Sequence, residues 1–318
     1  MDLCARSVQH VDMDLQGLQK SIMRALILLF LLFPLMMAMP SMAQNTPLSM
    51  VLSPDSEWEK IASGMKFCDA CCTDNEGNFY FADAGNNGPI RKVSHDGSVK
   101  EYGPRLYGVS GLQFGKDSRL YICQAKARRI SVLKNGESLE TVIENVRPND
   151  LVVTKNNQLY FTETSTQRVY HVNLNDKIKV LRIVDTGILK PNGIGLTPCD
   201  GTLFVSDHLD KEVWFFRIEK NHRLTMKTPY ASLRIRAKNL PSLGDGCDVD
   251  SLSRYYVTSD LGIQMFDPTG RLGGIILSPD PMKPVVSIAF SGKDFRYLYV
   301  ANGGSIYRRL MKVSGVGR

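Results

Sequence analysis

The chain has 318 residues, a formal net charge of +7, and a hydrophobic content of 43%. This composition excludes a disordered chain, because enough apolar residues are present to form a core. The basic residues are scattered, with only short runs such as residues 126–129, so the charge indicates a solvated surface and no nucleic-acid site.

The first 43 residues have the pattern of a secretory signal peptide. Lys20 and Arg24 precede an apolar run over residues 25–38, and small residues follow at Ser41 and Ala43. The run is shorter than the roughly 20 residues that span a bilayer, which favours cleavage near Ala43 over a membrane anchor. The sequence therefore predicts a secreted or periplasmic protein with no stable membrane insertion after cleavage.

The leader before the apolar run is unusually long for a signal peptide. It occupies residues 1–22, so either Met1 or Met23 is the true start. We expect residues 1–43 to be a signal peptide with an extended N-terminal region, followed by an N-terminal extension over residues 44–57.

A short apolar and aromatic triplet recurs six times after this extension. The triplets are Phe79-Tyr80-Phe81, Leu120-Tyr121-Ile122, Leu159-Tyr160-Phe161, Leu203-Phe204-Val205, Tyr255-Tyr256-Val257 and Leu298-Tyr299-Val300. A mostly apolar run and a turn rich in Gly, Asn or Asp precede the triplets, a pattern typical of antiparallel strands. The spacing of roughly 40 to 50 residues suits one four-stranded blade per repeat. We therefore predict an all-β fold, a six-bladed β-propeller over residues 58–318, closed by a strand near residues 58–62 that pairs with the last repeat.

One position in each repeat carries a side-chain oxygen. It lies eleven or twelve residues before the middle of the triplet and holds Asp69, Ser110, Asn149, Asn192, Asp245 and Ser287. In a closed ring this position converges on the central axis. Asn and Asp also favour turns, but two carboxylates and two amides at one register predict a metal site on the central axis. Oxygen donors suit Ca²⁺ or Mg²⁺ better than a thiolate-seeking ion.

The number and positions of the cysteines do not decide whether they form disulfides. Six cysteines remain after cleavage, namely Cys68, Cys71, Cys72, Cys123, Cys199 and Cys247. An even number in an exported chain permits disulfides. Four of the six lie inside predicted strands, where we expect small buried hydrophobic side chains. A redox pair of Cys68 with Cys71, or a zinc site there, is less well supported by the pattern.

The repeat openings Arg147-Pro148-Asn149-Asp150, Lys190-Pro191-Asn192-Gly193 and Gly244-Asp245-Gly246 carry a family resemblance. With the apolar run, turn and triplet that follow, they resemble the gluconolactonase, senescence-marker-protein and luciferin-regenerating-enzyme-like (regucalcin-like) family. The resemblance covers nearly the whole mature chain. It implies a six-bladed propeller with one divalent metal on the axis, Ca²⁺ in the first place and Mg²⁺, Mn²⁺ or Zn²⁺ as alternatives.

The resemblance also implies roles for particular residues. Asn192 and Asp245 match metal ligands of the family, Asn149 matches an amide that faces substrate or metal, and Arg147 matches a substrate contact. The family's first ligand is usually Glu, whereas the aligned residue here is Asp69, which is one methylene shorter.

These observations lead to a functional hypothesis. We expect an exported metal-dependent hydrolase of the gluconolactonase type that opens a sugar lactone or related ester, with a small lactone or sugar acid as its partner. Asp245 would be the general base, and Arg147 and Asn149 would orient the substrate. His208 is expected to be a hydrogen-bonded turn residue in preference to a general acid.

Two other functional hypotheses stay open. One is a non-catalytic propeller that binds a glycan or protein at the same mouth, since a fold does not fix function. The other is an esterase or phosphotriesterase on the same scaffold. The sequence implies no particular protein partner and leaves the oligomeric state open.

Overall fold

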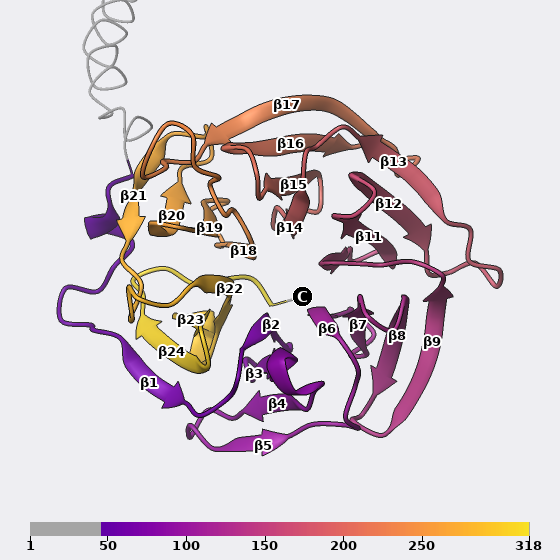
Figure 1. Cartoon of the computed structure of the whole chain (residues 1–318), viewed down its shortest axis with the longest axis horizontal. Coiled ribbons are helices and arrows are strands. Elements are labelled where there is room, and N and C mark those ends of the chain that lie inside the picture. Colours follow the sequence, from indigo (N-terminus) through magenta and orange to yellow (C-terminus); the bar gives the residue numbers. More distant parts are fainter. Residues whose placement is uncertain (1–45, 318) are drawn as a thin grey trace, which may run out of the picture. The chain divides into compact units, whose positions relative to one another are not determined.

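Six four-stranded antiparallel sheets are arranged as blades around a central axis in the computed structural model, which describes residues 46–317 (Figure 1). This confirms the predicted all-β, six-bladed propeller. The predicted signal peptide lies outside the described residues. No helix within residues 46–317 is long and apolar enough to cross a membrane.

Each blade runs outward from the axis in chain order. The first contains β2 (Asp69–Thr73), β3 (Phe79–Ala82), β4 (Ile90–Val93) and β5 (Val99–Glu101), and the second contains β6 (Val109–Phe114), β7 (Leu120–Gln124), β8 (Arg129–Lys134) and β9 (Ser138–Glu144). The third contains β10 (Leu151–Val153), β11 (Gln158–Glu163), β12 (Arg168–Asn173) and β13 (Arg182–Thr186). The fourth contains β14 (Pro191–Leu196), β15 (Thr202–Asp207), β16 (Glu212–Ile218) and β17 (Leu224–Ser232).

The last two blades complete the ring. The fifth contains β18 (Cys247–Val249), β19 (Tyr255–Ser259), β20 (Gly262–Phe266) and β21 (Leu272–Ile276). The sixth contains β22 (Val285–Ser291), β23 (Tyr297–Asn302), β24 (Ser305–Leu310) and, as its outer strand, β1 (Glu59–Ala62). The pairing of β1 with β24 confirms the predicted closing strand. Three short 3₁₀ helices, η1 (Leu48–Met50), η2 (Ala84–Asn86) and η3 (Lys293–Phe295), lie outside the sheets.

The predicted N-terminal extension contacts the ring. Val51 is fully buried and belongs to the same apolar cluster as Tyr256 and Phe290, and Leu52 forms a β-bridge with Met311. Residues 46–57 therefore contribute to the packing of the last two blades.

The triplets form the second strand of each blade and are buried. Their side chains alternate between the two faces of a blade and pack against both neighbours, so the core consists of apolar layers between adjacent blades. The large rings Tyr121, Tyr160, Tyr255, Tyr256 and Tyr299 are among the most completely buried side chains. These layers fix the blades around the axis.

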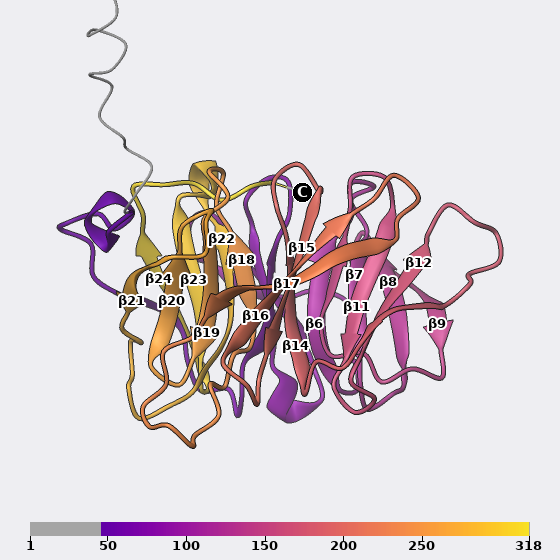
Figure 2. The same cartoon turned by 90° about the horizontal axis from the view of Figure 1, so that it is seen from above.

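The six blades begin on one face of the ring, which we call the mouth face. It is formed by the segments that lead into the innermost strands (63–68, 102–108, 145–150, 187–190, 233–246 and 277–284) and by the turns between second and third strands. Figure 2 shows the strands running between this face and the opposite one, where the last residues of the chain lie.

Candidate functional site

The predicted register residues sit at irregularities of the innermost strands. The pairing of first and second strands shifts between Asp69 and Cys72, between Pro191 and Ile194, and between Val285 and Ser287. In the third blade, Thr162 on β11 bonds two successive residues, accepting from the Asn149 N–H and donating its own N–H to the Asp150 carbonyl oxygen. Such β-bulges turn a side chain out of the regular alternation. They lie at the mouth end of the inner strands.

Hydroxyl groups on the second strands fix the backbone at this register from the preceding blade. Thr162 Oγ1 donates to the Asn192 carbonyl oxygen at 2.6 Å, and Ser206 Oγ donates to the Asp245 carbonyl oxygen at 3.0 Å. Glycine permits the close approach that these bonds need. A Cβ atom on Gly193 would lie 2.1 Å from the Asp245 carbonyl oxygen, so a larger residue there would push the two inner strands apart.

The structure brings Asp245 together with Asn192 and Asp69. The Asn192 side chain lowers the pKa of the Asp245 carboxyl, whereas the charges of the Asp69 and Asp150 carboxylates raise it. Asn192 is buried, whereas Asp69, Asn149 and Asp245 keep partial exposure. Asp69 and Asn192 therefore both act on Asp245 at the mouth end of the axis, and metal binding by these residues stays a prediction.

The carboxyl groups are held in an environment that opposes their charge. Burial raises the pKa of Asp69 from 3.8 to about 7. Burial and then the neighbouring charges of Asp69 and Asp150 raise the pKa of Asp245 well above its ordinary value, against the opposing effect of Lys190. Two carboxylates in this setting would be stabilised by a cation between them.

An unpartnered oxygen points to the same conclusion. Asn192 Nδ2 donates to His208 Nδ1 at 3.1 Å, while Asn192 Oδ1 is buried and accepts no hydrogen bond. A buried oxygen without a donor is unfavourable unless it has another partner. This oxygen and the carboxylates of Asp69 and Asp245 are all hard donors, the kind that Ca²⁺ or Mg²⁺ prefers.

Metal binding itself remains a prediction. Within residues 46–317, no group of three or more His, Cys, Asp or Glu side chains is placed to hold a metal. The predicted set has two carboxylates, Asp69 and Asp245, and otherwise depends on amide oxygens. Asn149 lines a hollow with Arg147 on the mouth face.

His208 supports the site in a way that the sequence did not reveal. Burial and then the charge of Lys190 lower its pKa, against an opposing effect of the Gly244 backbone. A neutral ring can accept the Asn192 amide proton at Nδ1. As predicted, His208 is a hydrogen-bonded turn residue, and its bond orients a candidate metal ligand.

Buried acids position the segments that carry the site. Glu163 Oε1 accepts from the Arg147 N–H at 2.6 Å, which holds the segment of Arg147 and Asn149. Asp207 accepts from the N–H groups of Leu189 and Lys190, which lead to Asn192. Both acids occupy the second position after the triplet, where every repeat has a buried polar residue: Asp83, Gln124, Glu163, Asp207, Ser259 and Asn302. This regularity was a signal available in the sequence.

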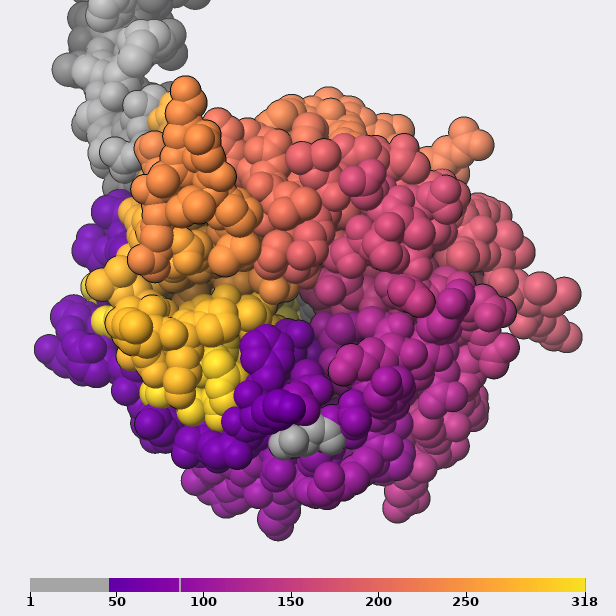
Figure 3. All heavy atoms as spheres, in the orientation of Figure 1, coloured from indigo at the N-terminus to yellow at the C-terminus, as the bar shows by residue number. Residues whose placement is uncertain are grey.

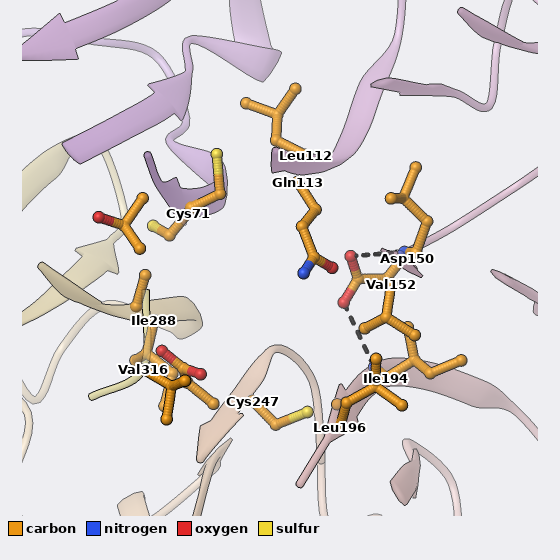
Figure 4. A pocket seen from close by; sticks show the side chains of 16 residues that line it. Cys71, Leu112, Gln113, Asp150, Val152, Ile194, Leu196, Cys247, Ile288 and Val316 are labelled. Atoms are coloured by element: carbon orange, nitrogen blue, oxygen red, sulfur yellow. Dashed lines mark hydrogen bonds between the residues drawn. The ribbon is translucent and has the colours of Figure 1, made fainter. Parts of the chain in front are cut away.

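Below the site the axis is narrow and lined by both apolar and polar side chains (Figure 4). A cavity of about 70 Å³ is lined by side chains that include Leu112, Val152, Ile194 and Val316, the last from the C-terminal segment. Asp150 also faces it, with its carboxylate accepting from the N–H groups of Leu151 and Ile194. Asp150 therefore ties the third blade to the fourth.

The cysteines of the described chain are all free thiols, namely Cys68, Cys71, Cys72, Cys123, Cys199 and Cys247. Burial raises the pKa of Cys71, Cys72, Cys123 and Cys247 well above the ordinary thiol value. They are therefore protonated packing residues, as the strand pattern indicated.

Comparison with known proteins agrees with this architecture. A family model for the SMP-30/gluconolactonase/LRE-like region matches residues 104–303. A gluconolactonase of Zymomonas mobilis is 23% identical over 304 residues, which covers 84% of this chain and 85% of that protein.

Two solved structures show the same fold. A gluconolactonase from Xanthomonas campestris has a TM-score of 0.73 at 18% identity, covering 84% of this chain and 93% of that one. Regucalcin from Agrobacterium tumefaciens, a calcium-binding protein, has a TM-score of 0.65 at 14% identity, covering 81% of this chain and 94% of that one.

Proposed function

Because the chain belongs to the SMP-30/gluconolactonase/LRE-like family, we propose that it is a metal-dependent hydrolase that opens a sugar lactone or related ester. The observation that carries this proposal is the buried, unpartnered Asn192 Oδ1 beside the carboxyl groups of Asp69 and Asp245. A bound cation would give that buried oxygen a partner.

Asp69, Asn192 and Asp245 would hold the ion, with Asn149 as a further oxygen donor. Ca²⁺ fits this donor set best, and Mg²⁺, Mn²⁺ or Zn²⁺ are alternatives. When bound, the ion would supply Lewis-acid polarisation of the lactone carbonyl.

Asp245 would act as the general base. It would take a proton from water as the water oxygen bonds to the carbonyl carbon. The ring C–O bond then breaks, the proton passes to the released alcohol oxygen, and the product is a hydroxy acid.

Arg147 and Asn149 would bind the polar part of the substrate. They line one hollow of about 450 Å³ on the mouth face, and the Arg147 side chain is exposed there. A guanidinium and an amide can both donate to hydroxyl or carboxylate oxygens. The Glu163 bond to the Arg147 backbone would keep these donors in place.

Turnover of a panel of sugar lactones, simple esters and phosphotriesters by the mature protein tests this function. Asp245→Asn should lower kcat by roughly 100-fold or more, the usual contribution of a general base. Asp294→Asn, at an exposed left-handed position on the opposite face, is a matched control and should leave kcat unchanged.

Chelation separates the enzyme from a binding propeller. Removal of metal should abolish turnover, and readdition of Ca²⁺ should restore it. Unchanged hydrolysis without metal contradicts the metal-dependent reaction. If the metal-loaded protein hydrolyses no lactone, ester or phosphotriester, the non-catalytic binding function replaces this proposal.

We also propose that the protein is exported, because residues 20–43 have the composition of a cleaved signal peptide. N-terminal sequencing of protein recovered outside the cytoplasm should find Gln44 as the first residue. Retention of the apolar run over residues 25–38 would instead indicate an anchor.

A further inference from the structure

The mouth face carries a cavity beside Asp245 whose wall is more apolar than polar. We propose that the substrate is a lactone or ester with an apolar substituent, such as an alkyl chain, that binds in this cavity. This inference rests on the proposed hydrolase function and names the substrate class within it.

The cavity has a volume of about 340 Å³ and reaches both Asp245 and His208. Small-molecule sites begin at about 300 Å³. Apolar side chains form much of its wall: Leu243 comes from the segment that leads into β18, while Pro281, Met282 and Val286 come from the segment that leads into β22 and its start. The position expected for the reacting carbonyl therefore adjoins an apolar wall.

Large apolar side chains are exposed along the same segments. Met282 is 89% exposed, Leu277 is 73% exposed and Leu240 is 49% exposed. Apolar side chains that cluster around a concave site are typical of ligand-binding surfaces. Figure 3 shows this face, with the orange and yellow segments of the fifth and sixth blades rising around a hollow.

The wall is held by hydrogen bonds, so the cavity is preformed. Ser242 Oγ donates to the carbonyl oxygens of Asp207 and Asp210, and the Leu243 N–H donates to the His208 carbonyl oxygen at 3.2 Å. Arg236 Nε contacts Asp260 Oδ2 at 2.6 Å at the rim. His208, which orients Asn192, thus also anchors the apolar wall and fixes it relative to the candidate site.

The second wall segment is anchored in the same manner. Asn302 Nδ2 donates to the carbonyl oxygens of Lys283 and Pro284 at 2.9 and 3.1 Å. Asn302 is fully buried at the end of β23. A preformed wall lowers the ordering cost of binding an apolar group.

The opposite side of the mouth has different chemistry. Its hollow is lined by Tyr107, Lys126, Arg147 and Asn149, and Lys126 Nζ lies 5.7 Å from the centre of the Tyr107 ring. This hollow belongs to the second and third blades, whereas the apolar cavity belongs to the fifth and sixth. In a six-bladed ring these lie across the axis from each other. The polar part of the substrate would face Arg147, and the apolar substituent would face Leu243.

A homologous series tests the inference. Metal-loaded protein is assayed with γ-lactones that carry no substituent, a butyl or a hexyl chain, and with a polyhydroxylated sugar lactone of similar size. Burial of each methylene should raise kcat/KM by about fourfold until the cavity is filled. A sugar lactone turned over as efficiently as the hexyl lactone overturns the inference.

A substitution links the preference to the cavity. Leu243→Asn suits the left-handed φ of 53° at this position and makes the wall polar. It should reduce the preference for the hexyl over the unsubstituted lactone, measured as the ratio of their kcat/KM values, by about tenfold. Leu252→Asn, an exposed leucine in the turn between β18 and β19 on the opposite face, is the matched control and should change neither value.

A substitute variant and a binding measurement test the inference if the first experiment fails. If Leu243→Asn does not fold, Met282→Ser at the exposed rim takes its place and should reduce the hexyl preference in the same direction. If no lactone is hydrolysed, the proposed function fails, and calorimetry with the ring-opened hydroxy acids of the same series decides the inference. Affinity that rises with chain length supports the apolar site, and affinity that does not rise refutes it.

Discussion

In metal-free protein, Asp69→Asn should increase stability, and the increase should depend on pH. The folded protein holds the Asp69 proton up to about pH 7, whereas in the unfolded chain the group has its ordinary pKa of 3.8. Between these values the folded state binds more protons, so stability falls as pH rises. The loss is complete above the folded pKa.

The size of the effect follows from this difference in pKa. At 1.36 kcal/mol per pKa unit, ionised Asp69 destabilises the metal-free protein by up to about 4 kcal/mol above pH 7. Asn has nearly the same shape and cannot ionise. We therefore expect Asp69→Asn to raise the free energy of unfolding by up to this amount at about pH 8 and to change it little at about pH 4.

Urea unfolding in the presence of a chelator measures the difference. Adding Ca²⁺ should offset this difference, because a ligand at 1,000 times its Kd stabilises the wild type by about 4.1 kcal/mol, whereas the variant lacks one carboxylate ligand. Asp294→Asn on the opposite face is the control. If Asp69→Asn is equally destabilising at both pH values with chelator, the site does not hold an unfavourable charge and the reasoning is refuted.

Three further predictions concern residues around the site. Glu163→Gln weakens the bond that holds the Arg147 segment, so steady-state assays should show KM raised by roughly 10-fold with a smaller change in kcat; a fall in kcat alone would contradict a positioning role. Ser206→Ala removes the hydrogen bond to the Asp245 carbonyl oxygen and should lower the free energy of unfolding by about 1 kcal/mol in urea titrations, and no loss would show that the blades are held without it. Burial lowers the pKa of His171 to about 4, so the neutral ring supports the fold above pH 6.5 and this support is lost as pH falls toward 4. His171→Gln should flatten the decline of stability between pH 6.5 and 4, and an unchanged decline would place the acid-sensitive group elsewhere.

The blade number and the register of the site residues were determined by the sequence alone. The triplets alternate and lie between turn residues, so each repeat specifies its own strands through local contacts. Trp58 to Ala62 could be assigned to ring closure because the last repeat lacks an outer strand of its own. The positions of Asp69, Asn192 and Asp245 followed from counting within the repeat.

The chemistry of the site depended on contacts between blades, which no local pattern encodes. The Thr162 and Ser206 hydroxyls reach the carbonyl oxygens of Asn192 and Asp245 in the following blade, across 30 and 39 residues of sequence. His208 accepts a hydrogen bond from the Asn192 amide N–H, and this bond orients the amide whose oxygen has no partner. The apolar cavity likewise requires two separate segments to meet over Asp245. Such features arise only when the ring closes, because ring closure brings residues distant in the chain within bonding distance and removes them from water.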